Sequence, residues 1–295
     1  MVSLSECIPW MTVSSAESLA IVTLNLCTII IFIKNRNLRK RSTYLVINLA
    51  VIDMFVGRVV VYDVFYWFGV DCNLWEWHFI EHWTFILLDV LSLWFPTASL
   101  TNITIIALER VHATFCPLRH RVLKKWVYGL IIAVVWIISC LLSVSSRLLW
   151  WVKEKQYNTY TCFTFISICL VIICVSYSSI VVKVRYGAQP QHHGAASRER
   201  KLTMTLLIVT VVSLLLYLPF VVIVLVIHIS KSEIFSSAPI QSFFNITVLL
   251  FLANSVANPI VYAIRMPDYR SAFFALFRRR AQRQRHVAML PLRNI

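Results

Sequence analysis

Charged residues are scarce in this chain of 295 residues: they make up 14% of it, whereas hydrophobic residues make up 59%. A soluble globular domain carries about 25% charged residues, so the composition excludes that class. No internal repeat is visible, which argues against a transporter built from inverted halves. The connections between the apolar stretches are short, which excludes a separately folding ligand-binding domain.

Long apolar stretches dominate what remains. Each is near the ~20 residues that cross the hydrocarbon core of a bilayer, where backbone groups must bond within a helix. We therefore expect an all-α membrane protein, a seven-transmembrane helix bundle with spans at 18–33, 43–69, 83–107, 127–149, 162–184, 202–228 and 240–264. This divides the chain into an extracellular N-terminus (1–17), a transmembrane domain (18–265) and a basic cytoplasmic tail (266–295).

The tail is expected to begin with a short amphipathic helix. Aromatic residues recur there at helical spacing with arginines between and after them, a pattern typical of a helix lying on the inner leaflet. These aromatic residues are Tyr269, Phe273, Phe274 and Phe277.

Basic residues are absent before Lys34, and 23 of the 28 lysines and arginines fall in four segments: Lys34–Arg41, Arg110–Lys125, Lys183–Lys201 and Arg265–Arg293. Positive charge stays on the cytoplasmic side of a membrane. We therefore predict a multi-pass plasma-membrane protein with its N-terminus outside and its C-terminus in the cytoplasm. The net charge of +15 indicates this topology and contact with anionic lipid, not nucleic-acid binding.

A few polar groups interrupt the apolar spans. Asp53 falls near the middle of span two, where an ionisable group is functional by default. A protonated, hydrogen-bonded core aspartate is the alternative. In span three, steps of three and four place one set of residues on a single helix face. They are Asp89, Ser92, Pro96, Ser99, Ile103, Ile106 and Arg110.

Six short motifs then occur in order in spans one, two, three, four, six and seven. They are Asn25, Leu49-Ala50-Val51-Ile52-Asp53, Glu109-Arg110-Val111, Trp136, Pro219 and Asn258-Pro259-Ile260-Val261-Tyr262. Together they resemble the rhodopsin-like G-protein-coupled receptors over about residues 18–280. The resemblance implies a receptor, not an enzyme, that converts extracellular ligand binding into activation of a heterotrimeric G protein.

The resemblance also assigns roles to matching positions. Family receptors hold a sodium ion at mid-membrane as an allosteric modulator, and the matching oxygen-bearing residues are Asp53, Ser99, Asn254, Ser255 and Asn258. No other cofactor is expected. The activation switch at the cytoplasmic end would comprise Glu109, Arg110, Glu199, Tyr177, Tyr262 and Pro259.

Several positions depart from the family pattern. Span six has Tyr217 where tryptophan is usual, span five has Cys169 where proline is usual, and span three has Phe85 in place of a cysteine. The last two losses resemble the melanocortin-like branch, whereas the motif Tyr262-Ala263-Ile264-Arg265 is similar to that of adenosine receptors.

A ligand must enter the bundle or sit on its short outer loops, as a small molecule or short peptide. The expected lining is Asp63, Asp89, Ser92, Phe95, Tyr217, Phe220 and Phe251. Family receptors for amines carry an acid at the position of Ser92, so a biogenic amine is disfavoured. Asp63 and Asp89 would suit a cationic ligand or basic peptide, unless one of them neutralises Arg58.

Three outer cysteines, Cys7, Cys72 and Cys162, allow three single disulfides. Cys72–Cys162, which would join two outer loops, is our choice, with no bond as the alternative. No metal site is expected, because the zinc-protease pattern His78-Phe79-Ile80-Glu81-His82 lacks a third ligand and reads as accidental.

A polytopic transporter or channel remains the alternative function. It would need a continuous polar path, whereas polarity here forms one central cluster and one inner pair. A retinal photoreceptor is excluded because 240–264 contains no lysine for a Schiff base.

Overall fold

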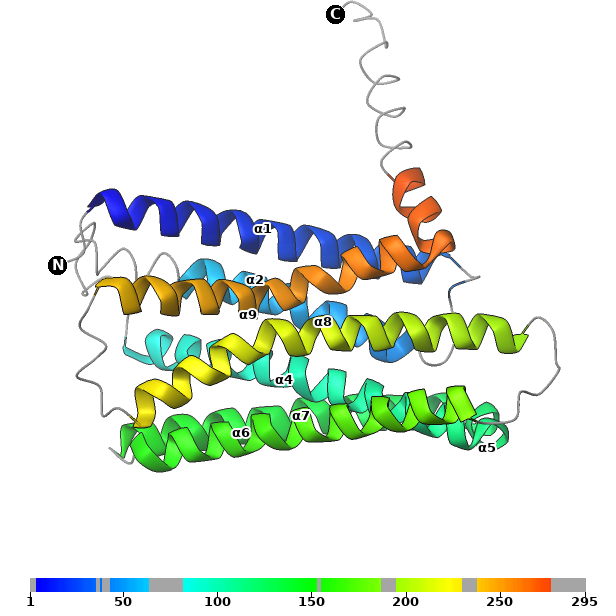
Figure 1. Ribbon diagram of the computed structural model, residues 1–295. Coiled ribbons are helices and arrows are strands. Elements are labelled where there is room, and N and C mark those ends of the chain that lie inside the picture. The colour runs from blue at the N-terminus through cyan, green and yellow to red at the C-terminus, as the bar shows by residue number, and fades with distance from the viewer. Residues whose placement is uncertain are drawn as a thin grey trace, which may run out of the picture.

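Long helices run side by side along one axis in the computed structural model of this chain (Figure 1). The structure describes residues 4–35, 38, 43–63, 82–152, 155–186, 195–229 and 238–276. Within these residues, seven helices are long and apolar enough to cross a membrane. They are α1 (Leu4–Lys34), α2 (Thr43–Asp63), α4 (His82–Phe115), α6 (Lys125–Trp151), α7 (Lys155–Tyr186), α8 (Ala195–Ile229) and α9 (Ala238–Arg265). A short helix, α5 (Pro117–Val122), joins α4 to α6.

The bundle confirms the predicted fold class, but several helices are longer than the predicted spans. Helix α1 begins at Leu4, inside the stretch 1–17 that we expected to be an extracellular N-terminus. The predicted span started at residue 18 because Ser14, Ser15 and Glu17 interrupt the apolar stretch just before it. In the structure Ser14 and Ser18 are buried on α1, so they face neighbouring helices and do not end the span.

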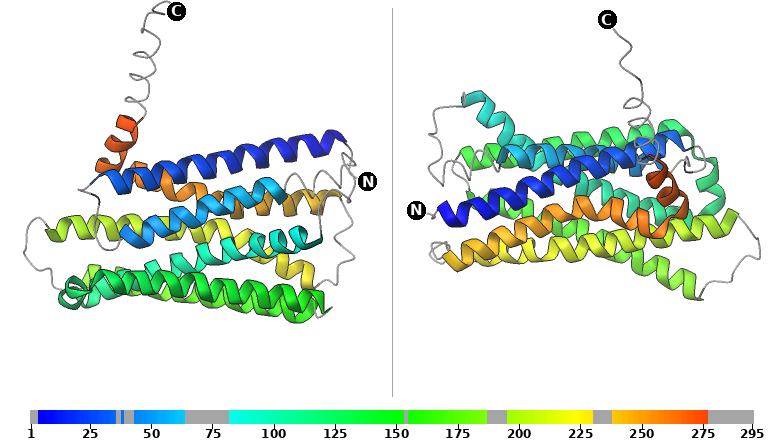
Figure 2. Two further views of the ribbon diagram at one scale, coloured as in Figure 1. Left: turned by 180° about the vertical axis from the view of Figure 1, so that it is seen from behind. Right: turned by 90° about the horizontal axis from the view of Figure 1, so that it is seen from above.

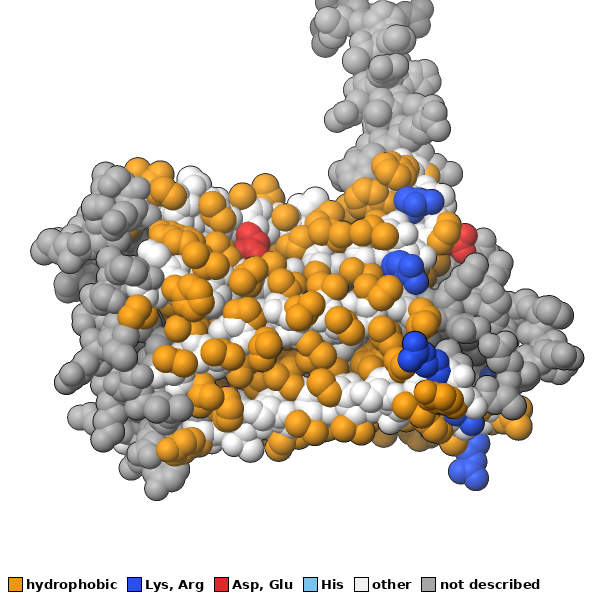
Figure 3. All heavy atoms as spheres, in the orientation of Figure 1, with side chains coloured by type: hydrophobic (Ala, Val, Ile, Leu, Met, Phe, Trp, Pro, Cys, Tyr) orange, Lys and Arg blue, Asp and Glu red, His pale blue; other side chains and the backbone are white. Residues whose placement is uncertain are grey.

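The bundle buries polar residues among a hydrophobic core and is apolar outside. Its exterior is covered by hydrophobic side chains along most of its length, and lysines and arginines gather at one end of the face in Figure 3. Helix α6 shows the pattern clearly, because one face of it exposes Leu130, Val134, Ile137, Leu141, Val144 and Leu148. An apolar stripe at this helical spacing suits contact with lipid.

Helix α4 lies at the centre and contacts α2, α6, α7 and α8, while α1 packs on α2 and α9. Prolines lie inside α8 and α9, at Pro219 and Pro259. Figure 1 shows both helices changing direction along their length. A proline inside a helix removes a backbone hydrogen bond and clashes with the preceding turn, which accounts for these bends.

Helices α1 and α2 approach each other closely at Gly57. The hydroxyl of Ser18 donates a hydrogen bond to the carbonyl oxygen of Gly57. A Cβ atom added to Gly57 would lie 2.8 Å from Cγ2 and 3.0 Å from Cβ of Ile21. Ile21 is fully buried, so it has no room to move away. The absence of a side chain at residue 57 therefore sets the spacing of the two helices.

Replacing Gly57 with alanine should destabilise the bundle by about 1–3 kcal/mol, the usual cost of overpacking a core. Gly129→Ala is the matched control, because a Cβ atom there meets nothing within 4 Å and the gain in helix propensity is the same. Thermal unfolding of the purified protein in detergent measures both. Equal unfolding temperatures for the two variants would contradict the close approach at Gly57.

A further helical segment, 267–276, follows α9 and turns across the axis of the bundle (Figures 1 and 2). The Tyr269 side chain is fully buried, and its hydroxyl lies 2.8 Å from that of Thr28 on α1. Burial raises the pKa of Tyr269 to about 12, so this hydroxyl stays protonated at neutral pH. The orientation suits the predicted helix on the inner leaflet, with Phe274 exposed for lipid. Phe277 lies outside the described residues.

Candidate functional site

Asp53 is fully buried where α2, α4 and α9 meet. One carboxylate oxygen, Oδ1, accepts hydrogen bonds from the hydroxyls of Ser99 at 2.8 Å and Ser255 at 3.0 Å. The other, Oδ2, accepts one from the amide of Asn258 at 2.8 Å. The structure therefore joins four of the five residues expected at the sodium site through direct hydrogen bonds.

The fifth residue, Asn254, is buried beside this group but turns its amide nitrogen to the hydroxyl of Tyr217, 2.9 Å away on α8. The side-chain oxygens of Asn25, Asn254 and Asn258 are all buried without a hydrogen-bond partner among the described residues. A buried carboxylate and orphaned amide oxygens are the donor set that a hard cation or ordered water requires. We call Asp53, Ser99, Asn254, Ser255 and Asn258 the central polar cluster.

A second buried network joins α2, α4 and α6. The amide nitrogen of Asn48 donates to Oδ1 of Asn102 at 2.9 Å, and Asn102 donates to the carbonyl oxygen of Leu45 at 3.0 Å. The indole nitrogen of Trp136 donates to Oδ1 of Asn48 at 3.0 Å. Sequence reasoning assigned no role to Asn48 or Asn102, although two asparagines inside apolar spans are themselves a signal of interhelical hydrogen bonding.

Glu109 and Arg110 form an ion pair near the α5 end of the bundle, with both side chains almost fully buried. The other carboxylate oxygen of Glu109 lies 2.7 Å from Nε2 of His120 on α5 and accepts a hydrogen bond from the hydroxyl of Tyr128 at 3.2 Å. Three side chains, one each from α4, α5 and α6, thus converge on one carboxylate. Periodicity did not indicate His120 and Tyr128, because α4 ends at Phe115 and these residues lie on α5 and α6.

Two tyrosines expected in the switch are buried on separate helices. Tyr177 on α7 accepts a hydrogen bond from Thr210 of α8 at 3.0 Å. Tyr262 follows Pro259 on α9, and its hydroxyl is buried without a partner among the described residues. The side chain of Glu199, the acid expected opposite Arg110, lies outside the described residues.

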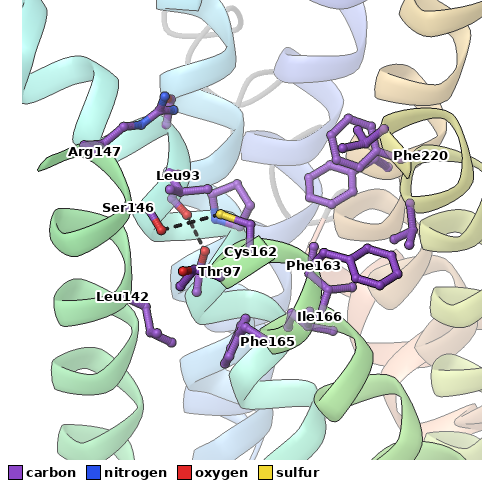
Figure 4. A pocket seen from close by; sticks show the side chains of 17 residues that line it. Leu93, Thr97, Leu142, Ser146, Arg147, Cys162, Phe163, Phe165, Ile166 and Phe220 are labelled. Atoms are coloured by element: carbon purple, nitrogen blue, oxygen red, sulfur yellow. Dashed lines mark hydrogen bonds between the residues drawn. The ribbon is translucent and has the colours of Figure 1, made fainter. Parts of the chain in front are cut away.

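A cavity of about 370 Å³ lies between α4, α6, α7, α8 and α9. Of the expected lining, Ser92, Phe220 and Phe251 do border it. Its other walls, several of which are labelled in Figure 4, include Thr97, Ser146, Arg147, Cys162, Phe163 and Phe165. The volume lies within the usual range of small-molecule sites.

Three residues expected in this lining, Asp89, Phe95 and Tyr217, do not border the cavity. Phe95 is buried toward α2, where its ring stacks on Phe55 with centroids 5.0 Å apart. Tyr217 is turned toward Asn254, and its ring contacts that of Phe251, which does border the cavity. Helical periodicity placed Phe95 and Tyr217 on inward faces but did not separate the cavity from the packed core. The side chain of Asp63 lies outside the described residues.

Asp89 is paired with Arg147 of α6, Nη1 to Oδ1 at 3.2 Å. Sequence reasoning had weighed only Arg58 as a partner for this acid, and Arg58 is exposed in the structure. Asp89 lies near the start of the predicted span 83–107, and Arg147 lies near the end of the predicted span 127–149. Because consecutive spans cross the membrane in opposite directions, the two residues have a similar depth, and this depth was the available signal of their pairing. With its charge balanced, Asp89 no longer supports the expectation of a cationic ligand.

The expected disulfide between Cys72 and Cys162 does not form. Cys162 keeps its thiol, which lies 3.5 Å from the hydroxyl of Ser146, whereas Cys7 is disulfide-bonded. Helix α1 begins at Leu4, so Cys7 lies within its first turns. Cys72 and the pattern His78–Glu81 lie outside the described residues, as does the side chain of His82.

One family model and several known proteins are similar to this chain in sequence. The sequence model of one family, described as 7 transmembrane receptor (rhodopsin family), matches residues 24–262. The rat histamine H2 receptor is 28% identical over 329 residues, covering 98% of this chain and 87% of the receptor. Dopamine receptor 2 of Drosophila melanogaster is 34% identical over 158 residues, 49% of this chain and 26% of the relative. The dog adenosine receptor A3 is 23% identical over 300 residues, 92% of this chain and 91% of the relative.

Proposed function

Because this chain belongs to the rhodopsin family of seven-transmembrane, G-protein-coupled receptors, we propose that a ligand in the cavity of α4, α6, α7, α8 and α9 controls the ion pair of Glu109 and Arg110. The chain is a multi-pass membrane receptor and not an enzyme. Each relative described above is likewise a receptor, which leaves the transporter or channel alternative without support.

One observation carries the proposal, an unbroken line of contacts from the cavity to the central polar cluster. The rings of Phe220 and Phe251 border the cavity with centroids 4.8 Å apart. Phe251 packs on Tyr217 at 4.9 Å, and Tyr217 accepts the hydrogen bond of Asn254. A ligand that moves either phenylalanine therefore alters the packing of Tyr217 against the cluster.

Sodium is proposed to bind at Asp53 with Ser99, Asn254, Ser255 and Asn258 and to favour the inactive arrangement. The orphaned amide oxygens of Asn254 and Asn258 support this, because each has a lone pair that nothing in the described residues uses. When bound, the cation would balance the carboxylate charge inside the membrane. The residues themselves hold α2, α4 and α9 together around it.

At the other end, the buried pair of Glu109 and Arg110 is proposed to hold the inactive arrangement, with Glu199 as a second acid. An outward movement of α8 would take Glu199 away from Arg110 and let Tyr177 and Tyr262 turn toward the opened space, with α9 bending at Pro259. Such a latch is a two-state element whose balance a ligand can shift.

The charge distribution supports the orientation in the membrane that we propose, with the N-terminus outside. Basic residues at the α5 and tail-helix end would then meet the G protein and anionic lipid headgroups. The relatives' names include histamine and dopamine receptors. We propose a different ligand here, an extracellular small molecule or short peptide that is not a biogenic amine, because Ser92 replaces the acid of amine receptors.

Guanine-nucleotide exchange on heterotrimeric G proteins, measured with the full chain reconstituted in lipid vesicles, tests the proposal. We expect the purified chain to accelerate exchange above protein-free vesicles, and a ligand to change that rate. Solute flux across the same vesicles serves as the control. Flux without any acceleration of exchange, across several G-protein classes, would overturn the receptor function.

A further inference from the structure

The cavity is apolar apart from a few side chains, and most of these already donate their hydrogens elsewhere. The hydroxyl of Ser92 donates to the carbonyl oxygen of Asp89 at 2.8 Å, and that of Thr97 donates to Leu93 at 2.7 Å. Ser146 lies in contact with the thiol of Cys162. These groups line the wall without offering a donor to a ligand.

Arg147 differs from them. Its Nη1 atom binds Asp89, but its Nε–H is buried and has no acceptor among the described residues. The side chain is 24% exposed, and it borders the cavity. An N–H group buried without an acceptor is unfavourable, so Arg147 gains when its guanidinium turns toward an acceptor in the cavity that it borders.

Figure 4 shows how the two kinds of lining are separated. Arg147 lies on one side of the cavity, and the rings of Phe163 and Phe220 lie on the other. Phe251 adds a third ring beside Phe220. The cavity therefore offers a polar contact at one end and aromatic surface at the other.

An ammonium group fits this arrangement poorly. It would need a carboxylate, and Asp89 is the only acid in contact with the cavity's described lining. Taking Asp89 from Arg147 would leave a guanidinium half-buried without its counter-ion, which is strongly unfavourable. An acceptor on the ligand adds to the Arg147–Asp89 pair and does not compete with it.

We propose that the cavity binds an apolar molecule that has an aromatic ring and a carboxylate. Arg147 binds the carboxylate at one end of the cavity, and Phe163, Phe220 and Phe251 pack on the ring at the other. A carboxylate accepts two hydrogen bonds from one guanidinium in its fork geometry, which makes it the strongest acceptor for this group. The inference rests on the proposed receptor function and names its ligand class.

Matched probes test the head group. We would titrate the purified full chain in detergent with phenyl, indolyl and naphthyl compounds, each bearing an acetate, an ethanol or an ethylamine tail, by isothermal calorimetry. The best acetate should bind about tenfold more tightly than the amine of the same ring, as expected for a charge-assisted hydrogen bond. Tighter binding of the amines, or no binding by any probe, overturns the proposal.

Two variants test whether the preference for the acetate depends on Arg147 and Asp89. Arg147→Gln should weaken acetate binding about tenfold and leave the alcohol nearly unchanged, because only the acetate uses the guanidinium charge. Asp89→Asn should instead strengthen acetate binding, because it frees Nη1. Arg270→Gln, an exposed arginine on segment 267–276, is the matched control. An equal loss for all three tails in Arg147→Gln would indicate a structural role and contradict the proposal.

Calorimetry needs no G protein, so this result is separate from the receptor function. Acetate binding without nucleotide exchange would count against the receptor function alone, whereas exchange stimulated only by the amines would count against the ligand class alone.

Discussion

Asp53→Asn should abolish the sodium dependence of this receptor. In the unaltered chain we expect sodium chloride to lower basal nucleotide exchange and to raise the unfolding temperature, relative to equal choline chloride. A cation present at ten times its Kd stabilises the state that binds it by about 1.4 kcal/mol. Asparagine keeps the volume and one oxygen of Asp53 but removes the charge that attracts the cation.

The control for this experiment is a second acid inside the membrane. Glu17 on α1 has a buried carboxylate oxygen but lies outside the central polar cluster. Glu17→Gln should therefore keep the full sodium response. If Asp53→Asn and the unaltered chain respond to sodium alike, or if neither responds, the cluster is not a sodium site and its orphaned oxygens bind water.

Glu109→Gln should raise basal nucleotide exchange severalfold. The change removes the ion pair with Arg110 and weakens the contacts with His120 and Tyr128. Breaking a buried ion pair by removing one partner costs about 3–5 kcal/mol. Every 1.4 kcal/mol of this cost that falls on the inactive arrangement alone shifts its balance with the active one about tenfold.

Exchange in vesicles at matched receptor density, without ligand, is the measurement. His120→Ala keeps the ion pair and removes one contact with Glu109, so it should give a smaller rise in the same direction. Ser145→Ala is the neutral control, because that hydroxyl is exposed and binds only a carbonyl oxygen of its own helix. A basal rate in Glu109→Gln no higher than in Ser145→Ala would show that the pair does not restrain the receptor.

The helices could be predicted from the sequence for a physical reason, whereas sodium binding at the central polar cluster stays a prediction. A bilayer requires long apolar helices, so composition alone indicates the spans. The cluster followed from resemblance, which aligned Asp53, Ser99, Ser255 and Asn258 across three spans, and these side chains are joined by hydrogen bonds in the structure.

The pairings between helices were less predictable. Periodicity identifies the inward face of a helix but not which neighbour meets it, so the partner of Asp89 was missed although Arg147 lies at a similar depth. His120 enters from α5, a short helix between spans whose position no pattern specifies. Cys7, which is disulfide-bonded, takes part in two of the three pairings that spacing could not separate.

The aromatic contacts of the tail helix have a consequence for the membrane itself. Tyr262 lies between Phe32 and Tyr269, with ring centroids 6.0 Å from each. Should Tyr262 rotate inward on activation, Tyr269 loses a neighbour and keeps its contacts with Thr28 and Phe32 on α1. Such coupling is reciprocal: if activation changes the contact between Tyr262 and Tyr269, then a change in the position of Tyr269 also shifts the activation equilibrium. Lipids that draw this amphipathic segment toward the headgroups are therefore expected to alter ligand affinity at the other end of the bundle, so the lipid composition around the segment would affect the receptor.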